Sequence, residues 1–245
     1  MNLLKSLAER IIRVAGPDAT NALLGSLLRG YEHLSYRRLR SLGFRPSTIF
    51  DIGAFHGDWS RGAREIFPDA RIIMVEAQPA LLEPLEKVVS ELGNASVHNS
   101  LLSAEPQEDV TFYSMGTGSS VKPERSDADR KVLHIASTTL DHIWRAESLV
   151  RQPVFVKIDV QGYELDVLSG ASEVLENTEW LQLETALLAY NEGAPQLGEV
   201  CNFMEERGFF PTEITGFSRP AEHLVQIDLL FARNGSELRP DKFSF

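Results

Sequence analysis

The stretch that decides the fold is Thr48-Ile49-Phe50-Asp51-Ile52-Gly53-Ala54-Phe55-His56-Gly57. Its first half has the apolar, β-branched character of a buried strand, and its second half is a turn that contains two glycines. A helical pattern follows over residues 59–67. A strand, a glycine-containing turn and a helix form one unit of an open α/β sheet, in which ligands bind outside the carboxyl ends of the strands.

The charge of this turn indicates which ligand it suits. From Asp51 to Gly57 it has the pattern D-x-G-x-x-x-G, whereas dinucleotide folds use G-x-G-x-x-G and place a pyrophosphate at the helix N-terminus. An acid here repels a pyrophosphate but suits a cationic ligand, such as the sulfonium of S-adenosylmethionine. The next strand, expected at 71–75, runs into Glu76, and an acid at that place can accept hydrogen bonds from ribose hydroxyls. The pattern therefore favours S-adenosylmethionine over NAD.

Strand and helix patterns alternate along the rest of the main domain, which is typical of a mostly parallel sheet with helices on both faces. We predict further strands at 96–98, 110–113, 154–158, 180–184, 210–214 and 225–231, and helices at 59–67, 80–92, 163–168 and 196–207. Residues 114–130 show no periodicity, so we expect an exposed loop there. This loop and residues 187–197 are candidates for acceptor specificity.

Two amphipathic helices are predicted ahead of the main domain, with apolar residues at helical spacing in 3–12 and 23–42. We therefore divide the chain into an N-terminal helical extension (1–45), a main domain (46–235) and a C-terminal tail (236–245). The extension could pack on the main domain, form a homodimer or cover a substrate cleft.

Composition excludes several classes of function. Asp and Glu outnumber Lys and Arg by 35 to 24, which argues against a nucleic-acid partner because phosphate binding needs a basic face. No apolar run is long enough to span a membrane, and charges interrupt the N-terminal apolar residues, so we expect a cytoplasmic protein. The single cysteine, Cys201, excludes an internal disulfide and a cysteine-rich zinc site.

Two more strands end in acids. Asp159 follows the strand at 154–158, and Glu184 ends the strand at 180–184. In a parallel sheet both acids lie on the same edge as Asp51 and Glu76. Asp159 and Glu184 could offer oxygen ligands to Mg²⁺, but no Asp-Asp or histidine-rich cluster supports a metal, so we do not favour one.

Five blocks together resemble the FkbM-type family of S-adenosylmethionine-dependent methyltransferases. They are Phe50-Asp51-Ile52-Gly53-Ala54-x-x-Gly57, Val75-Glu76-Ala77-Gln78-Pro79, Thr139-Leu140-Asp141, Lys157-Ile158-Asp159-Val160-Gln161-Gly162-Tyr163-Glu164 and Gln226-Ile227-Asp228-Leu229-Leu230-Phe231. The resemblance implies a class I methyltransferase (Rossmann-like) fold for the main domain, with a seven-stranded, mostly parallel sheet whose last strand is antiparallel. It also implies O-methylation of a hydroxyl on a small-molecule or sugar-containing acceptor.

The resemblance also assigns roles to single residues. Asp159 would face the transferred methyl group, and the cofactor would be bound by Asp51, Gly53, Gly57, Glu76, Gln78, Ser100 and Leu101, with Glu76 at the ribose and Ser100 and Leu101 near the adenine. The chain departs from the family pattern at Phe55, where Asn is common, and at Gln161, where Glu is common.

Methyl transfer to a hydroxyl benefits from a general base within hydrogen-bond reach of that hydroxyl. Asp159 is our first candidate because it stands at a strand end. His56 is the second, because it lies in the cofactor turn and histidines as a class change charge near neutral pH.

Two other kinds of protein remain open from the sequence. One is a non-catalytic Rossmann-like binding module, which the departures at Phe55 and Gln161 allow. The other is an NAD-dependent oxidoreductase, which the pattern of the turn disfavours. The acceptor of a methyltransferase could also be a protein instead of a small molecule.

Overall fold

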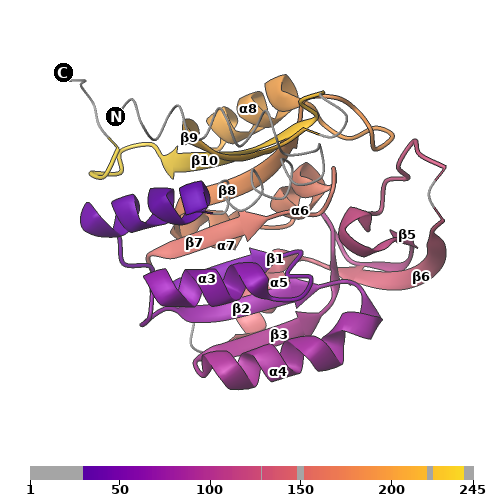
Figure 1. Ribbon diagram of the computed structural model, residues 1–245, viewed down its shortest axis with the longest axis horizontal. Helices are drawn as coiled ribbons and strands as arrows, with labels where there is room; N and C mark the ends of the chain where they lie inside the picture. Colours follow the sequence, from indigo (N-terminus) through magenta and orange to yellow (C-terminus); the bar gives the residue numbers. More distant parts are fainter. Residues whose placement is uncertain (1–29, 128, 148–151, 220–222, 240–245) are drawn as a thin grey trace, which may run out of the picture.

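A seven-stranded sheet forms the centre of the computed structural model, which describes residues 30–127, 129–147, 152–219 and 223–239 (Figure 1). Its strand order is β3-β2-β1-β7-β8-β10-β9. The strands are β1 (Thr48–Ile52), β2 (Arg71–Glu76), β3 (Ala95–Asn99), β7 (Val154–Ile158), β8 (Thr178–Ala186), β9 (Phe209–Ser218) and β10 (Gln226–Arg233). β10 pairs antiparallel with both of its neighbours, and the pairs from β3 to β8 are parallel. The expected mostly parallel sheet with an antiparallel last strand is confirmed.

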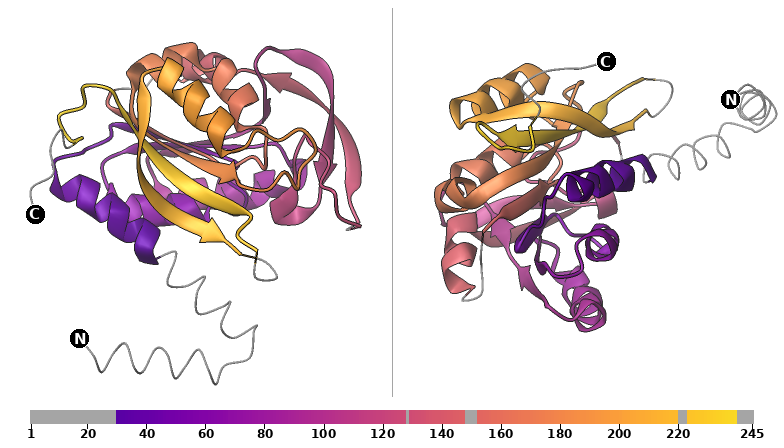
Figure 2. Two further views of the ribbon diagram at one scale, coloured as in Figure 1. Left: turned by 90° about the horizontal axis from the view of Figure 1, so that it is seen from above. Right: turned by 90° about the vertical axis from the view of Figure 1, so that its left-hand side faces the viewer.

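Helices cover both faces of this sheet. A helix over residues 30–41, α3 (Asp58–Ile66) and α4 (Leu82–Leu92), which follows the short η1 (Pro79–Leu81), lie on one face. The other face carries α5 (Leu140–Ala146), α6 (Glu164–Ser169), α7 (Ser172–Asn177) and α8 (Leu197–Glu206). Seen from above, the indigo helix and the orange α8 lie on opposite sides of the sheet (Figure 2). The helix expected at 163–168 corresponds to α6, whereas α5 and α7 were not predicted from the sequence.

The central strands are buried from end to end. Every residue of β1 and of β7 is buried, in keeping with a parallel strand that is covered on both faces. Alternate side chains enter two separate apolar clusters: Phe50 belongs to the cluster with α5 to α8, and Ile49 to the cluster with α3 and α4. This burial on both sides fixes the register, so the carboxyl ends of β1, β2 and β7 meet at one edge.

A second, three-stranded sheet lies between β3 and β7 in the sequence and extends from the main sheet (Figure 1). Its order is β4 (Leu101–Leu102), β6 (Lys131–Thr138), β5 (Gln107–Ser114). The strand expected at 110–113 belongs here, and β6 was not predicted. β6 comes directly after a charged stretch and is partly exposed on both faces, so its apolar alternation is weak.

The described part of the N-terminal extension packs on the main domain. Tyr36 and Leu39 of the 30–41 helix are buried in the cluster that includes α3 and α4. The helix expected at 3–12 and the first part of the one expected at 23–42 lie outside the described residues. Dimerisation through this extension remains a prediction. None of the helices in the described ranges has both the length and the apolar character that a membrane span requires.

Candidate active site

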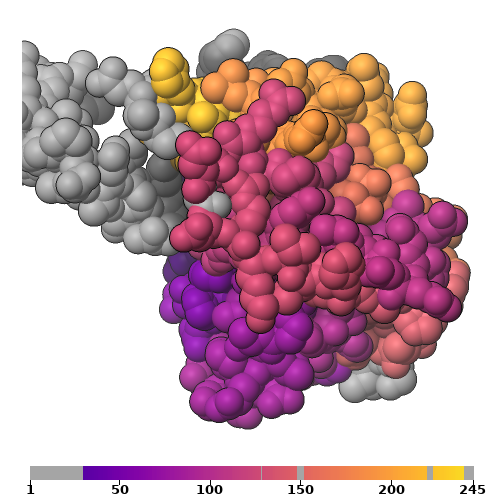
Figure 3. Space-filling model, turned by 90° about the vertical axis from the view of Figure 1, so that its right-hand side faces the viewer, coloured from indigo at the N-terminus to yellow at the C-terminus, as the bar shows by residue number. Residues whose placement is uncertain are grey.

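A cavity of about 240 Å³ opens at the carboxyl edge of the main sheet, between β1, β2 and β7 and the residues of the second sheet. Figure 3 views the molecule from this side, where the magenta and rose atoms of the second sheet and its connections lie against the violet atoms of the first half of the main domain. The cavity brings together seven of the nine predicted site residues: Gly53, His56, Glu76, Gln78, Ser100, Leu101 and Asp159. Asp51 and Gly57 do not line it.

The turn after β1 requires glycine at two positions. Gly53 has φ +73°, and a Cβ there would lie 1.8 Å from the carbonyl oxygen of Asp159. Gly57 has φ +74°, and its Cβ would meet Val88 of α4 at 3.0 Å. These contacts explain both glycines by packing within the chain, so Gly57 acts by letting α3 approach α4 closely.

Glu76, at the end of β2, is held by backbone amides. Its Oε2 accepts from the Phe55 N–H at 2.9 Å, and its Oε1 accepts from the Gln78 N–H at 2.9 Å. The residue is 6% exposed and lines the cavity. A carboxylate has about four lone-pair sites, so Glu76 can still accept hydrogen bonds from a ligand's hydroxyls.

Asp51 is fully buried beneath the cavity and pairs with Lys157 of β7. Its Oδ2 accepts from the Ser60 hydroxyl at 2.7 Å, and its Oδ1 lies 3.2 Å from the Lys157 ammonium. The same ammonium donates to the Gly53 carbonyl at 3.1 Å and lies 3.7 Å from Asp159 Oδ2. Asp51 therefore meets the cavity through Lys157, which does line it.

The charge on Lys157 is secured by its neighbours. Burial alone would lower the pKa of Lys157, but Asp51 and then Asp159 raise this pKa above its ordinary value. Lys157 was not among the site residues predicted from the sequence. The register of β1 and β7, which places it beside Asp51, is the information that was missing.

Asp159 faces the cavity and is tied to Glu184 through Gln161. The Gln161 amide nitrogen donates to Asp159 Oδ1 at 2.9 Å and to Glu184 Oε2 at 2.5 Å. Glu184 is buried and does not line the cavity; burial first, and Asp159 second, raise its pKa well above the usual value. Across the described ranges, no group of three or more His, Cys, Asp or Glu side chains is placed to hold a metal ion.

Two further acids near this edge were not selected from the sequence. Glu164 accepts from the backbone N–H groups of Gly162 at 2.9 Å and Val160 at 3.2 Å, and it thereby shapes the turn after β7. Burial raises the pKa of Glu164 to about 7. Asp228 lies opposite Glu184 on β10, and burial followed by the charge of Asp159 raises its pKa to about 7.

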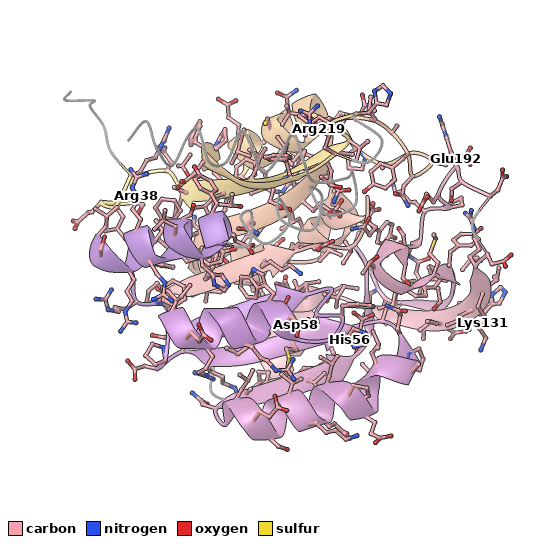
Figure 4. The ribbon with its side chains drawn as sticks, viewed as in Figure 1. Arg38, His56, Asp58, Lys131, Glu192 and Arg219 are labelled. Carbon is pink, nitrogen blue, oxygen red and sulfur yellow. The ribbon has the colours of Figure 1, made fainter. Side chains whose placement is uncertain are left out.

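The remaining predicted residues lie along the cavity wall. His56 and Asp58 come together at the start of α3 (Figure 4), and the exposed His56 ring lies 4.1 Å from the Phe55 ring, centre to centre. The Ser100 N–H donates to the Glu76 carbonyl at 3.0 Å. Leu101 is buried with Phe112 of β5, so this part of the wall is apolar.

The stretch 114–130 is only partly the exposed loop that we expected. Residues 116–118 form a short helical turn, η2 (Gly116–Gly118), at the cavity, and Ser120 is buried. The Ser120 hydroxyl donates to the Gln161 carbonyl at 2.8 Å. The prediction is wrong for Ser120, because a stretch without periodicity can still be buried by single polar contacts.

Residues 122–125 pair with residues 190–193 through their backbones. The Arg125 N–H donates to the Tyr190 carbonyl at 2.8 Å, and the Glu192 N–H donates to the Pro123 carbonyl at 2.9 Å. Asn191 adds a side-chain donor to the Lys122 carbonyl at 2.9 Å. We call these two segments the loop pair. It joins the two stretches that the sequence suggested for acceptor specificity.

Two cavity residues have an unusual backbone. Among the described residues, Phe55 (φ 48°) and Gln161 (φ 55°) are the non-glycine residues with positive φ. Both line the cavity, and both are positions where the chain departs from the pattern that it resembles. Such strain persists only where the surroundings enforce it, and it concentrates at functional sites.

Comparison with known proteins agrees with this geometry. A family model described as the methyltransferase FkbM domain matches residues 51–211. No curated protein matches the sequence. Among solved structures, a methyltransferase FkbM from Methylobacillus flagellatus KT is 18% identical with a TM-score of 0.50, over 80% of this chain and 47% of that chain. This chain therefore spans about half the length of that relative, and the likeness supports the class I methyltransferase fold.

Two other solved structures resemble the chain less closely. The magnesium protoporphyrin IX methyltransferase of Synechocystis PCC 6803 is 10% identical with a TM-score of 0.49, over 93% of this chain and 90% of that chain. The precorrin-6y C5,15-methyltransferase of Geobacter metallireducens GS-15 is 13% identical with a TM-score of 0.47, over 83% of this chain and 87% of that one.

Proposed function

This chain belongs to the FkbM methyltransferase family, and from that premise we propose that it is an S-adenosylmethionine-dependent O-methyltransferase. Its acceptor is a hydroxyl of a small-molecule or sugar-containing compound. One observation carries the proposal: Glu76 and Asp159, two acids at the ends of the strands on either side of β1, line one cavity with Gly53 between them.

The cavity suits the parts of the cofactor. Glu76 keeps lone pairs for ribose hydroxyls, and Leu101 and Phe112 give an apolar surface for the adenine. The carboxylate of Asp159 and the carbonyl of Gly53 also line the cavity. The charges of Asp51 and Asp159 together exceed the single positive charge of Lys157, so the net charge favours a positively charged sulfonium over a pyrophosphate. S-adenosylmethionine supplies the methyl group, already activated on its sulfonium.

The protein's part is alignment and removal of one proton. A carboxylate oxygen of Asp159 accepts the proton of the acceptor hydroxyl as the new carbon–oxygen bond forms. Lys157 and Gln161 hold that carboxylate from two sides, so its position is set before the acceptor arrives. His56, which is exposed at the mouth of the cavity, is the second candidate base.

The test separates binding from catalysis in one variant. Purified protein is assayed with isotopically labelled cofactor against sugars, nucleotide-sugars and small hydroxylated metabolites. The substitution Asp159→Asn should remove turnover. The affinity for S-adenosylhomocysteine, measured by calorimetry, should stay within about 3-fold of the wild type, which corresponds to a binding free energy difference below about 1 kcal/mol. Full activity of Asp159→Asn would exclude Asp159 as the base, and His56→Gln is then the variant to measure.

The rival functions give different results in the same experiment. A non-catalytic binding module would bind S-adenosylhomocysteine and transfer no label to any acceptor. An NAD-dependent oxidoreductase would not bind S-adenosylhomocysteine and would change the absorbance of NADH. Label transferred to a protein instead of a small molecule would keep the methyltransferase and change its acceptor class.

A further inference from the structure

Gln161, in the turn after β7, makes hydrogen bonds to residues well outside this turn. Its amide nitrogen donates to both Asp159 and Glu184, as described above, and its Oε1 lies 3.1 Å from the Tyr190 hydroxyl. Its backbone carbonyl accepts from the Ser120 hydroxyl at 2.8 Å. Gln161 thus contacts acids at the ends of two strands, Tyr190 of the loop pair, and Ser120, which lies two residues before the other segment of the loop pair.

The backbone of Gln161 shows that the surroundings enforce this arrangement. Its φ of 55° costs on the order of 1 kcal/mol for a non-glycine residue, and the following Gly162 has φ +92°. A Cβ at Gly162 would meet the Cβ of Ala194 at 2.6 Å, so the turn is pressed against the chain that follows Tyr190. The strained turn directs the Gln161 side chain between Asp159 and Glu184.

We propose that Gln161 is a positioning residue that fixes the Asp159 carboxylate and couples its position to the pairing of the two segments of the loop pair. The proposal rests on the proposed function only in treating Asp159 as the acid that meets the acceptor. The structural part, a link between residue 161 and the loop pair, stands on the four contacts above.

In this chain an amide suits this position better than the glutamate that is common in the family pattern. An amide nitrogen has two hydrogens, so it can donate to two carboxylates at once. An ionised glutamate in place of Gln161 would have no hydrogen to donate and would put a negative charge beside the Asp159 carboxylate, where like charges repel. A glutamate could still accept from Tyr190, so the substitution Gln161→Glu removes the donated bonds with little change in shape.

The first experiment needs no acceptor. Hydrogen–deuterium exchange is measured on the full chain with bound S-adenosylhomocysteine, with the amides of Arg125 and Glu192 as reporters because each donates across the loop pair. In Gln161→Glu, exchange of peptides covering 120–126 and 188–193 should be at least about 10-fold faster, as expected for a local opening. Unchanged exchange at these reporters overturns the proposal.

Two further variants complete this experiment. Gln107→Glu makes the same chemical change at an exposed residue of β5, and its reporter exchange should equal that of the wild type. The double substitution Gln161→Glu with Glu184→Gln returns an amide to the pair and should bring exchange back to within about 3-fold of wild type. The proposal is overturned if reporter exchange in the double variant is as fast as in Gln161→Glu. If the single variant is too unstable to study, exchange in the double variant that is more than about 3-fold faster than in the wild type overturns the proposal.

The second experiment tests the link to catalysis. In Gln161→Glu, kcat for methyl transfer should fall at least about 10-fold, while S-adenosylhomocysteine affinity stays within about 3-fold. A packing role alone would make Gln161→Ala worse than Gln161→Glu and would lower affinity in parallel, and that result overturns the proposal. Absence of methyl transfer by the wild type would count against the proposed function, and the exchange result would still decide the role of Gln161.

Discussion

The two acids that face the cavity are held in different ways. Glu76, on the side of β1 and β2, is held mainly by backbone N–H groups of the turn after β1 and of the residues that follow β2, with one longer hydrogen bond from the Gln78 side chain at 3.3 Å. Asp159, on the side of β7 and β8, is held by the side chains of Lys157 and Gln161, and Gln161 in turn depends on Glu184.

This difference has a consequence for what each side can change. Hydrogen bonds from backbone amides depend on turn geometry, so the side of Glu76 tolerates changes of side chain as long as the turn is kept. Hydrogen bonds from side chains depend on residue identity, so one substitution on the side of Asp159 alters the charge and position of the acid. We infer that a constant cofactor is recognised by the first side and a variable acceptor by the second.

The largest effect is expected where the two sides touch. Gly53→Ala would place a Cβ 1.8 Å from the Asp159 carbonyl at φ +73°, so the free energy of unfolding should fall by about 3 kcal/mol or more. Urea unfolding measures this loss. The control is Gly208→Ala, which has φ +75° and no atom within 4 Å of the added Cβ, and it should cost only about 1 kcal/mol. Equal losses would show that the contact with Asp159 is unimportant.

Removal of the acid on the first side should weaken cofactor binding. Glu76→Ala should weaken S-adenosylhomocysteine affinity about 10- to 100-fold, because hydrogen bonds to a charged group contribute about 1.5–3 kcal/mol. Isothermal titration calorimetry measures the dissociation constant. Asp159→Asn is the matched acid-to-neutral change on the second side. If it weakened binding as much as Glu76→Ala, the division between the two sides would be wrong.

The second side should make stability depend on pH. Burial raises the pKa of Glu164 from 4.5 to about 7, so the folded protein binds a proton there that the unfolded chain has lost. The contribution of Glu164 to the free energy of unfolding is therefore full below about pH 4.5. It is lost as the pH rises through about 7, which lowers stability by on the order of 1–3 kcal/mol. Unfolding by urea at several pH values measures the slope. Glu164→Gln should flatten it, and Glu86→Gln, on the exposed side of α4, should not.

The smallest effect concerns the backbone strain at Phe55. Phe55→Asn and Phe55→Ala both remove the half-buried ring, but asparagine adopts positive φ more readily than alanine. The asparagine variant should therefore be more stable by roughly 0.5–1 kcal/mol, measured as the difference in their thermal unfolding. Equal stability of the two would show that the Phe55 backbone relaxes when the ring is removed.

The fold was largely predictable because its signals are local. β1, β2, β7 and β8 were expected within a few residues of their observed ends, because each is an apolar run followed by an acid or a turn. β6 was missed because its apolar alternation is weak, and the short helices α5 and α7 were missed as well, although the equally short α6 was predicted. The second sheet could not be foreseen without β6.

The site was predictable where its residues stand directly at the carboxyl ends of strands. Gly53 and Glu76 could be placed at the cavity from strand ends. The contact of Asp51 with Lys157 depends on strand register, and the clamp of Gln161 on Glu184 joins residues 23 positions apart. Asp228 approaches this edge from β10, which is antiparallel, so the rule that ligands lie at carboxyl ends does not select it.

The loop pair is joined mainly by main-chain hydrogen bonds, and this has a consequence for engineering. The bonds between Arg125 and Tyr190 and between Glu192 and Pro123 use backbone atoms, so they do not specify which side chains these segments carry. Side chains at exposed positions of these segments, such as Arg125 and Glu192, can be randomised in a combinatorial library without removing these bonds. Such a library would explore new acceptors on an unchanged frame.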